Sequence, residues 1–149
     1  FIAELLAAGV IEYAQLHGSE DAAYIEALRK RTALLGKTAK IIKTVKVGST
    51  ADLENISEID CEYLLLDAWS KEGEAAGGNG RTFEWSLIKA LEKPFFLAGG
   101  LTVDNVQQAV RMTSPYGIDA SSCMETEDCK DLNKMKAFAQ AVRVNETNN

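Results

Sequence analysis

Short apolar runs recur along the chain at intervals of roughly 25 residues, and each is followed by a segment with helical periodicity. The runs are rich in β-branched and large aliphatic residues, which is typical of strands. They predict five strands, at Tyr13–His17, Lys40–Val47, Tyr63–Asp67, Phe95–Ala98 and Ile118–Ala120. Strands that alternate with helices require a parallel sheet with right-handed crossovers, so the pattern predicts an α/β fold.

The segments between these runs predict the helices. The chain opens with a helix over Phe1–Ala8, which Gly9 closes. Ser19 and Asp21 can cap a helix that runs to about Lys30, and its residues Ala23, Ile25, Ala27 and Leu28 include a core face. Further helical segments are predicted at Ala51–Ile56, Phe83–Leu91, Val103–Val110 and Asp131–Val142, the last with Leu132, Met135, Phe138 and Val142 on one face. The sequence thus predicts one domain over 1–143 and a frayed polar tail over 144–149.

Two closures of such a sheet are possible, an open doubly wound sheet or part of a (β/α)8 barrel. No G-x-G-x-x-G follows an early strand, which weighs against dinucleotide binding. Polar residues gather where the predicted strands end, at His17, at Asp67 and at Ser121-Ser122. Barrel enzymes keep their sites at that end of the strands, so the arrangement favours the barrel.

Composition narrows the function classes. The net charge is -6, with a pI near 4.9, which argues against a nucleic-acid partner or an anionic membrane surface. No apolar run approaches the length of a membrane span, and no signal peptide is visible. The three cysteines, Cys61, Cys123 and Cys129, are odd in number and lack the spacing of a metal site. We read them as reduced thiols, and we expect a cytoplasmic protein without a metal or cofactor.

The stretch K-P-F-F-L-A-G-G-L at Lys93–Leu101 carries the clearest chemical signal. An apolar strand, expected to be buried on both faces, stops at Gly99 and Gly100, and the next helix starts directly after them. Glycine lets an anion approach the backbone closely, and a helix N-terminus adds partial positive charge. The stretch therefore suggests a phosphate cradle, although a tight turn between strand and helix is the simpler alternative.

Several motifs together resemble one enzyme family. They are Q-L-H-G, L-L-L-D, G-G-N-G-R-T-F-E-W-S-L, K-P-F-F-L-A-G-G-L-T-V-D-N-V, Y-G-I-D-A-S-S-C-M-E-T and K-D-L-N-K-M. In this combination the sequence resembles phosphoribosylanthranilate isomerase of tryptophan biosynthesis. The resemblance implies a (β/α)8 barrel that converts N-(5-phosphoribosyl)anthranilate into the 1-deoxyribulose phosphate by an Amadori rearrangement.

The resemblance also assigns roles to residues. It makes Asp67 the general acid that opens the furanose ring, where a cap on the following loop is the alternative. Such an acid needs a raised pKa near neutral pH. The phosphate site would consist of Gly99, Gly100, Ser121 and Ser122, with Asp119 orienting loop N–H groups. Gln15 and His17 would contact the substrate, although a lone histidine is more often structural. Gly77-Gly78-Asn79-Gly80 resembles a mobile loop beside the acid, and Trp85 is expected in the core.

The chain also departs from the family. The resemblance covers five of eight βα units, and it places the base cysteine on the first strand and a substrate-binding arginine on the second, neither of which is present. No cysteine here matches the base, since Cys61 precedes its strand, Cys129 follows the phosphate loop, and Cys123 takes the place of a glycine. We expect a small phosphorylated substrate, and a homo-oligomer or a pairing with the missing N-terminal segment. A non-catalytic phosphate-binding module and an assembly fragment stay open as alternatives.

Overall fold

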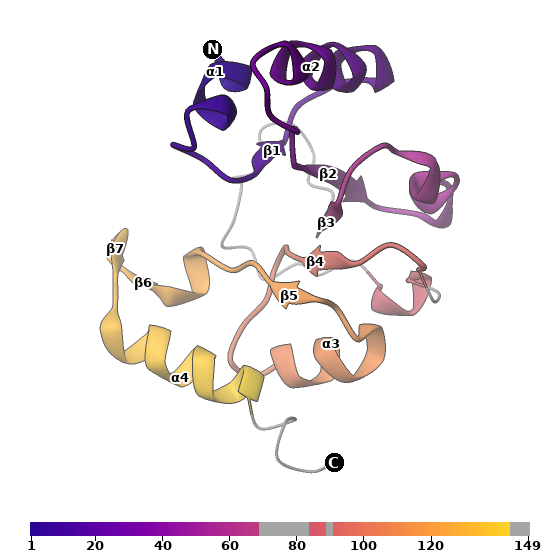
Figure 1. Cartoon of the computed structure of the whole chain (residues 1–149). Coiled ribbons are helices and arrows are strands. Elements are labelled where there is room, and N and C mark those ends of the chain that lie inside the picture. Colours follow the sequence, from indigo (N-terminus) through magenta and orange to yellow (C-terminus); the bar gives the residue numbers. More distant parts are fainter. Residues whose placement is uncertain (69–83, 89–90, 144–149) are drawn as a thin grey trace.

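Five parallel strands form the centre of the molecule. The computed structural model describes residues 1–68, 84–88 and 91–143. The strands are β1 (Ala14–Leu16), β2 (Ile41–Val47), β3 (Tyr63–Ala68), β4 (Phe95–Leu97) and β5 (Gly117–Ile118), and they pair in the order β1-β2-β3-β4-β5 (Figure 1). All five predicted strands are confirmed, with ends that shift by one or two residues. Among the described residues, β1 pairs only with β2 and β5 only with β4, so the sheet has two open edges.

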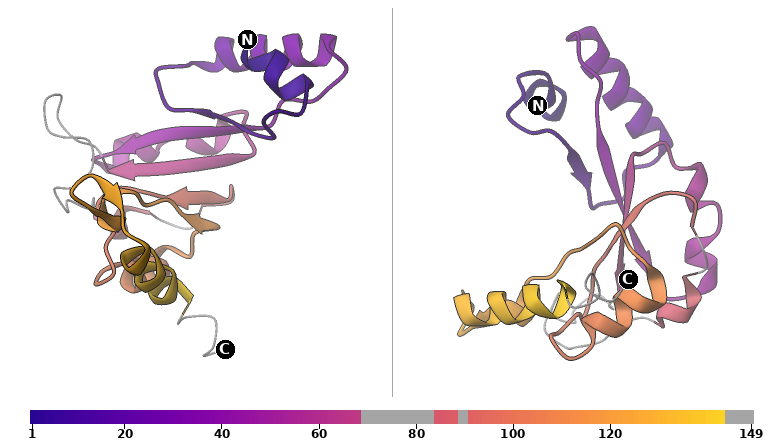
Figure 2. Two further views of the ribbon diagram at one scale, coloured as in Figure 1. Left: turned by 90° about the vertical axis from the view of Figure 1, so that its left-hand side faces the viewer. Right: turned by 60° about the horizontal axis from the view of Figure 1, so that its bottom comes forward.

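The strand order decides between the two closures that the sequence leaves open. A doubly wound sheet reverses its order at a switch point, whereas barrel strands follow one another without reversal. The five strands here are neighbours in chain order throughout. Figures 1 and 2 show that the helical segments surround the strands on one side and leave the other side open. The fold is therefore α/β with the sheet arrangement of a TIM-type barrel.

The helices agree with the predicted pattern in position but less well in detail. They are α1 (Ile2–Ala7), α2 (Ala22–Leu34), α3 (Val106–Thr113) and α4 (Leu132–Arg143). Short 3-10 turns lie at Thr50–Leu53, Ile56–Glu58, Trp85–Leu87 and Ser122–Met124. A two-stranded antiparallel hairpin, β6 (Glu125–Thr126) and β7 (Cys129–Lys130), precedes α4 and was not predicted.

Helix α2 is longer than predicted, and its core face is narrower. Asp21 caps it as expected, because its carboxylate accepts a hydrogen bond from the Tyr24 N–H at 2.9 Å. The buried residues are Ile25, Leu28 and Thr32, which follow the helical repeat. Of the four residues expected to include a core face, Ile25 and Leu28 are buried, whereas Ala23 and Ala27 are exposed. At about 100° per residue, these two alanines lie on the opposite side of the helix from the buried stripe and point away from the sheet.

Two other helical predictions need correction. The predicted helix at Ala51–Ile56 is replaced by two 3-10 turns, Thr50–Leu53 and Ile56–Glu58, which residues 54 and 55 separate. The described part of the predicted helix at Phe83–Leu91 contains only the turn Trp85–Leu87. Trp85 is nevertheless buried, as expected. In α4 only Phe138 of the predicted apolar face is buried, whereas Leu132 and Met135 are exposed. The N-terminal half of α4 thus extends past the core that the described residues form. Residues 144–149, where a frayed tail was expected, lie outside the described part of the chain.

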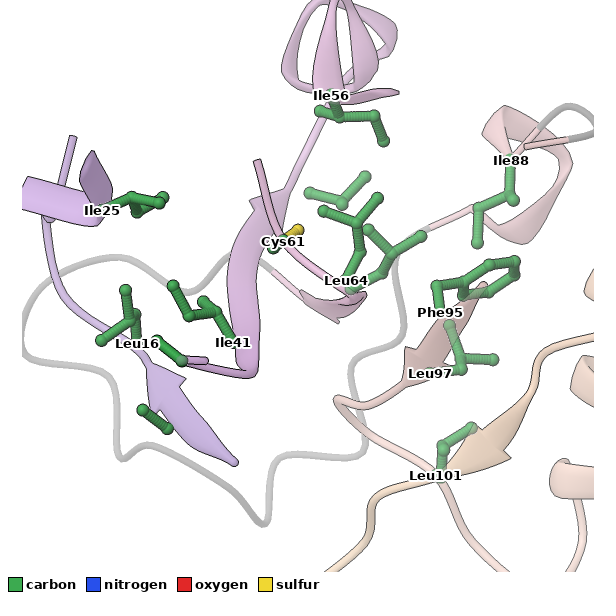
Figure 3. Close-up of a cluster of buried hydrophobic side chains, with 14 of the residues drawn as sticks. Leu16, Ile25, Ile41, Ile56, Cys61, Leu64, Ile88, Phe95, Leu97 and Leu101 are labelled. Atoms are coloured by element: carbon green, nitrogen blue, oxygen red, sulfur yellow. The ribbon is translucent and has the colours of Figure 1, made fainter. Parts of the chain in front are cut away.

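The core lies between the sheet and the helices. Alternate strand residues point to this side, and their side chains meet those of α2, the 3-10 turns and the loop after β4 (Figure 3). The labelled members of the cluster are Leu16, Ile25, Ile41, Ile56, Cys61, Leu64, Ile88, Phe95, Leu97 and Leu101. The outward face of the sheet is thereby covered.

The inner face of the sheet carries aromatic rings at the N-terminal ends of the strands. The ring centroids of Tyr63 and Tyr116 are 4.8 Å apart, and Phe96 lies 5.5 Å from each. Phe96 is only half-buried and Tyr116 is exposed. The expectation that β4 is buried on both faces is therefore wrong, because its inner face is covered only in part.

Candidate functional site

Three strands bring polar side chains together at the C-terminal edge of the sheet. Asp67 on β3 stands in register with Lys46 on β2, and His17 directly follows β1. The Lys46 ammonium forms an ion pair with the Asp67 carboxylate. The Nε2 atom of His17 lies 3.9 Å from the same carboxylate oxygen, Oδ2. The edge thus combines one carboxylate with two groups that can carry positive charge.

The strand pleat explains which side chains reach this edge. Residues 44 and 46 of β2 share one face, and Thr44 meets His17 there, with 3.2 Å between Oγ1 and Nδ1. Lys43 points to the opposite face, where its ammonium donates to the Gly18 carbonyl at 2.7 Å and pairs with Glu20 at 2.9 Å. This pair lowers the pKa of the Glu20 carboxyl, first of all through the hydrogen bond from Lys43. Two lysines three residues apart therefore have different surroundings.

Asp67 lies near the C-terminal end of β3, although the sequence predicts that it is the last residue of the strand. Strand β3 continues to Ala68, so Asp67 is its penultimate residue. Its side chain is 19% exposed, compared with 42% for Lys46 and 52% for His17. Sequence reasoning missed Lys46. The alternation of side chains along a strand could have identified it, because Lys46 lies two residues after the polar Thr44 and therefore on the same face of the sheet.

The loop after β4 packs directly against Asp67. Gly99 and Gly100 both have positive φ, at 86° and 64°. A Cβ atom on Gly99 would lie 2.5 Å from the Ala68 nitrogen and 2.9 Å from Oδ1 of Asp67. Only glycine fits in this conformation at this distance. The glycine requirement at residue 99 is thus a matter of close approach between neighbouring strands as well as of backbone conformation.

Helix α3 does not start at the two glycines, contrary to the prediction. It begins at Val106, and the intervening turn is held by Asn105. The Asn105 side chain accepts a hydrogen bond from the Thr102 N–H at 2.8 Å and donates one to the Gly100 carbonyl at 3.0 Å. The loop is therefore ordered by an asparagine, and the helix N-terminus lies several residues beyond the glycines.

The loop after β5 holds the second predicted phosphate-binding pair. Ser121 and Ser122 are exposed, and a 3-10 turn begins at Ser122. The Lys130 ammonium on β7 donates to Ser121 Oγ at 2.7 Å and to Glu125 Oε1 at 2.5 Å. The hydrogen bond from Lys130 lowers the pKa of the Glu125 carboxyl. Because β4 and β5 are neighbours, the two loops leave the same edge of the sheet side by side.

The other predicted site residues are less constrained. Gln15 is exposed on β1. It lies two residues before His17 and therefore on the same face of the sheet. The Asp119 N–H donates to the Leu97 carbonyl at 2.9 Å, but its carboxylate bonds to no N–H group among the described residues. The orienting role predicted for Asp119 has no support in these contacts. The predicted mobile loop at 77–80 lies outside the described residues.

Comparison with known proteins gives this edge of the sheet a context. The family model described as N-(5'phosphoribosyl)anthranilate (PRA) isomerase matches residues 1–141. The chain belongs to this family. The N-(5'-phosphoribosyl)anthranilate isomerase of Acetivibrio thermocellus is 40% identical over 149 residues, and the match covers 95% of this chain and 66% of the relative. The isomerase of Caldanaerobacter subterraneus is 35% identical over 144 residues, covering 95% and 64%.

Solved structures of the isomerase family have the same fold. The Thermotoga maritima isomerase superposes with a TM-score of 0.75 at 29% identity, and the match covers 95% of this chain and 66% of that one. Another isomerase, solved in complex with reduced 1-(o-carboxyphenylamino)-1-deoxyribulose 5-phosphate, gives a TM-score of 0.70 at 26% identity and is covered to 64%. The chain thus spans about two thirds of the length of the family members that it matches.

Two of the three cysteines, Cys61 and Cys123, have a raised pKa. Burial raises the pKa of Cys61, which packs in the core at the N-terminal end of β3. Burial also raises the pKa of Cys123, which is half-buried against the core. Cys129 is exposed on the hairpin. A raised pKa reduces the thiolate fraction near neutral pH, so neither Cys61 nor Cys123 is suited to act as a base.

Three further features of the described residues concern metal binding, a cavity and membrane spans. Among the described residues, no group of three histidine, cysteine or acidic side chains could hold a metal ion. A cavity of about 270 Å³ lies at the opposite edge of the sheet, where Pro94, Ser114 and Tyr116 contribute to its lining. In the described part of the chain, no helix is long and apolar enough to cross a membrane.

Proposed function

We propose that this chain carries the acid and the phosphate-binding loops of an isomerase of tryptophan biosynthesis. The reaction converts N-(5-phosphoribosyl)anthranilate into 1-(2-carboxyphenylamino)-1-deoxyribulose 5-phosphate by an Amadori rearrangement. The observation that carries the proposal is the family match over residues 1–141, together with a carboxylate and two glycine- or serine-bearing loops on one edge of the sheet.

In the proposed mechanism Asp67 donates a proton to the furanose ring oxygen. The bond from that oxygen to C1 breaks, its electron pair stays on the oxygen, and a Schiff base forms with the substrate nitrogen. A base then removes the C2 proton, and the resulting enol becomes the ketone of the product. The reaction is an isomerisation, so its balance needs no oxidant and no cofactor. Asp67 recovers a proton before the next turnover.

Gly99, Gly100, Ser121 and Ser122 are proposed to hold the substrate phosphate. Two observations support this assignment: both glycines have positive φ, and both serine hydroxyls are exposed. Backbone N–H and serine O–H groups donate hydrogen bonds, which phosphate oxygens accept. Lys130 lies beside Ser121 in the same loop and is paired there with the Glu125 carboxylate. Gln15 and His17 are proposed to contact the rest of the substrate from β1.

The proposed base and a substrate-binding arginine belong to the part of the family that this sequence does not span. The raised pKa values of Cys61 and Cys123 support this division, since neither thiol is poised to replace the base. We therefore propose that the chain pairs with a second copy of itself or with the missing N-terminal segment, and that only this segment supplies the missing groups. The open edges at β1 and β5 support such pairing, because unpaired backbone groups favour the addition of strands.

A binding experiment tests the phosphate assignment. Ribose 5-phosphate added to the 149-residue chain is expected to shift the amide resonances of Gly99, Gly100, Ser121 and Ser122 before those of other residues. The measurement is an amide NMR titration, with ribose as the control that lacks the phosphate. Shifts that are confined to residues around Asp67, or equal shifts with ribose, would contradict the assignment.

An activity assay tests the isomerase itself. The chain alone is expected to show no turnover, whereas addition of the remaining segment of a family member, such as the Acetivibrio thermocellus isomerase, is expected to restore some. Sedimentation in the presence and absence of the segment shows whether pairing occurs. Phosphate binding without turnover under both conditions would favour a non-catalytic phosphate-binding module. A monomer that turns over substrate unaided would contradict the proposed division of catalytic groups.

A further inference from the structure

The loop after β1 carries His17 and is held by two charged side chains that the proposed mechanism does not use. Residues 17–20 belong to neither β1 nor α2. The Glu20 carboxylate accepts a hydrogen bond from the Gly18 N–H at 3.0 Å, and the Lys43 ammonium donates one to the Gly18 carbonyl at 2.7 Å. The same ammonium pairs with Oε2 of Glu20 at 2.9 Å. One ion pair thus holds both polar backbone groups of Gly18.

The effect of this ion pair is geometric. The Lys43 side chain is 10% exposed and the Glu20 side chain 25%, and at such depth the loss of hydration offsets much of the attraction, so the pair is weak evidence for stability. The Gly18 N–H belongs to the planar peptide group that leaves His17, so a fixed N–H fixes the torsion ψ of His17. A Cβ atom on Gly18 would lie 3.0 Å from Oε1 of Glu20, because the carboxylate packs closely over this peptide group.

The position of His17 depends on such a constraint, because its ring reaches across a neighbouring strand. Strand β2 separates β1 from β3, so the backbones of His17 and Asp67 are about 10 Å apart at the usual strand spacing. The ring spans much of this distance, since Nε2 lies 3.9 Å from Oδ2 of Asp67, and it passes Thr44 with 3.2 Å between Nδ1 and Oγ1. The ring is nevertheless 52% exposed. With β1 as its only anchor, His17 would sample further backbone and side-chain conformations.

We propose that the Glu20–Lys43 pair positions the His17 imidazole for contact with the substrate, an inference that rests on the substrate contact proposed for His17. Lys43 lies on the face of β2 opposite to Asp67, so the pair touches no reacting atom and acts through the loop. With the pair intact, His17 is in place before a ligand arrives. Without it, a ligand must order the side chain as it binds, and this ordering lowers the affinity.

NMR of the imidazole tests the positioning directly, because His17 is the single histidine of the chain. In the wild type we expect the Hα–Hβ couplings of one fixed rotamer and a nuclear Overhauser effect between the ring and the Thr44 methyl group. Glu20→Ala and Lys43→Met should average the couplings and abolish the Overhauser effect. Glu20→Gln should keep both, because an amide oxygen can still accept hydrogen bonds from Gly18 and Lys43.

Two further variants separate loss of the pair from a general loss of stability. The double variant Glu20→Ala/Lys43→Met leaves no buried charge without its partner, so it should fold and release His17 as the single variants do. Lys40→Met is the matched control, because Lys40 precedes the same strand at its other end and pairs with Glu12 at 2.8 Å. Lys40→Met should leave the His17 signals unchanged.

Calorimetry with reduced 1-(o-carboxyphenylamino)-1-deoxyribulose 5-phosphate connects the position of His17 to binding. The double variant is expected to bind this compound about 2–10-fold more weakly than the wild type, the range for ordering one side chain. Glu20→Gln and Lys40→Met should bind it as the wild type does. A ring that stays fixed in the double variant, or an affinity that is unchanged after its release, overturns the positioning role and leaves the isomerase function intact. A wild-type chain that binds neither this compound nor ribose 5-phosphate overturns both.

Discussion

Replacing Asp67 with asparagine is expected to lower the isomerase turnover number by about 10²–10⁴-fold, the usual contribution of a general acid. Asparagine has nearly the same shape as aspartate and can still accept a hydrogen bond from Lys46, but it has no proton to give to the ring oxygen. The measurement is the turnover number of the chain assayed with the segment that supplies the base. Affinity for ribose 5-phosphate should stay nearly unchanged, because the proposed phosphate loops lie on other strands.

Asp21→Asn provides the control for this experiment. Asp21 caps α2 through a hydrogen bond from Tyr24, and asparagine caps helices about as well as aspartate. This variant should therefore retain both turnover and stability. A turnover number for Asp67→Asn within a few-fold of the wild type would remove Asp67 from the mechanism. A loss of ribose 5-phosphate binding in parallel would instead indicate that Asp67 supports the structure of the site.

Gly99→Ala is expected to produce the largest loss of stability among single-methyl changes in the described loops. The new Cβ would lie 2.5 Å from both the nitrogen and the Cβ of Ala68, so the loop or β3 must move. The φ of 86° adds strain, because an L-residue in the left-handed region costs about 1–2 kcal/mol. Displacement of packed backbone adds a further ~1–3 kcal/mol. We expect urea unfolding to show a loss of about 3 kcal/mol in the free energy of unfolding.

Gly36→Ala separates the two contributions. Gly36 has a φ of 78°, close to that of Gly99, but a Cβ there would meet nothing within 4 Å. This variant should lose only the ~1–2 kcal/mol of backbone strain. Equal losses in the two variants would mean that the contact with Ala68 and Asp67 has no energetic effect. Because the new methyl group would also approach Oδ1 of Asp67 to 2.9 Å, Gly99→Ala should shift the side-chain carboxyl resonance of Asp67, and Gly36→Ala should not.

The agreement between sequence and structure is closest where a pattern acts locally. The strands at residues 41–47 and 63–68 follow from short stretches that are rich in β-branched and aliphatic residues. Asp21 was recognised as a cap from its place before an apolar repeat. The predictions fail where a neighbour in space decides. Leu132 and Met135 follow an apolar repeat in α4, but both are exposed because α4 extends there past the core that the described residues form.

The candidate site shows the same division. The sequence by itself determined the five strands, their parallel arrangement, and the placement of Asp67, Gly99 and Ser121 near strand ends, because these depend on the order and spacing of residues along the chain. Only the tertiary structure decided the sheet order, the start of α3 at Val106, the contact of Lys130 with Ser121 and the pairing of Lys46 with Asp67. These features depend on the register between strands and on loop paths, which bring together residues that no local pattern connects.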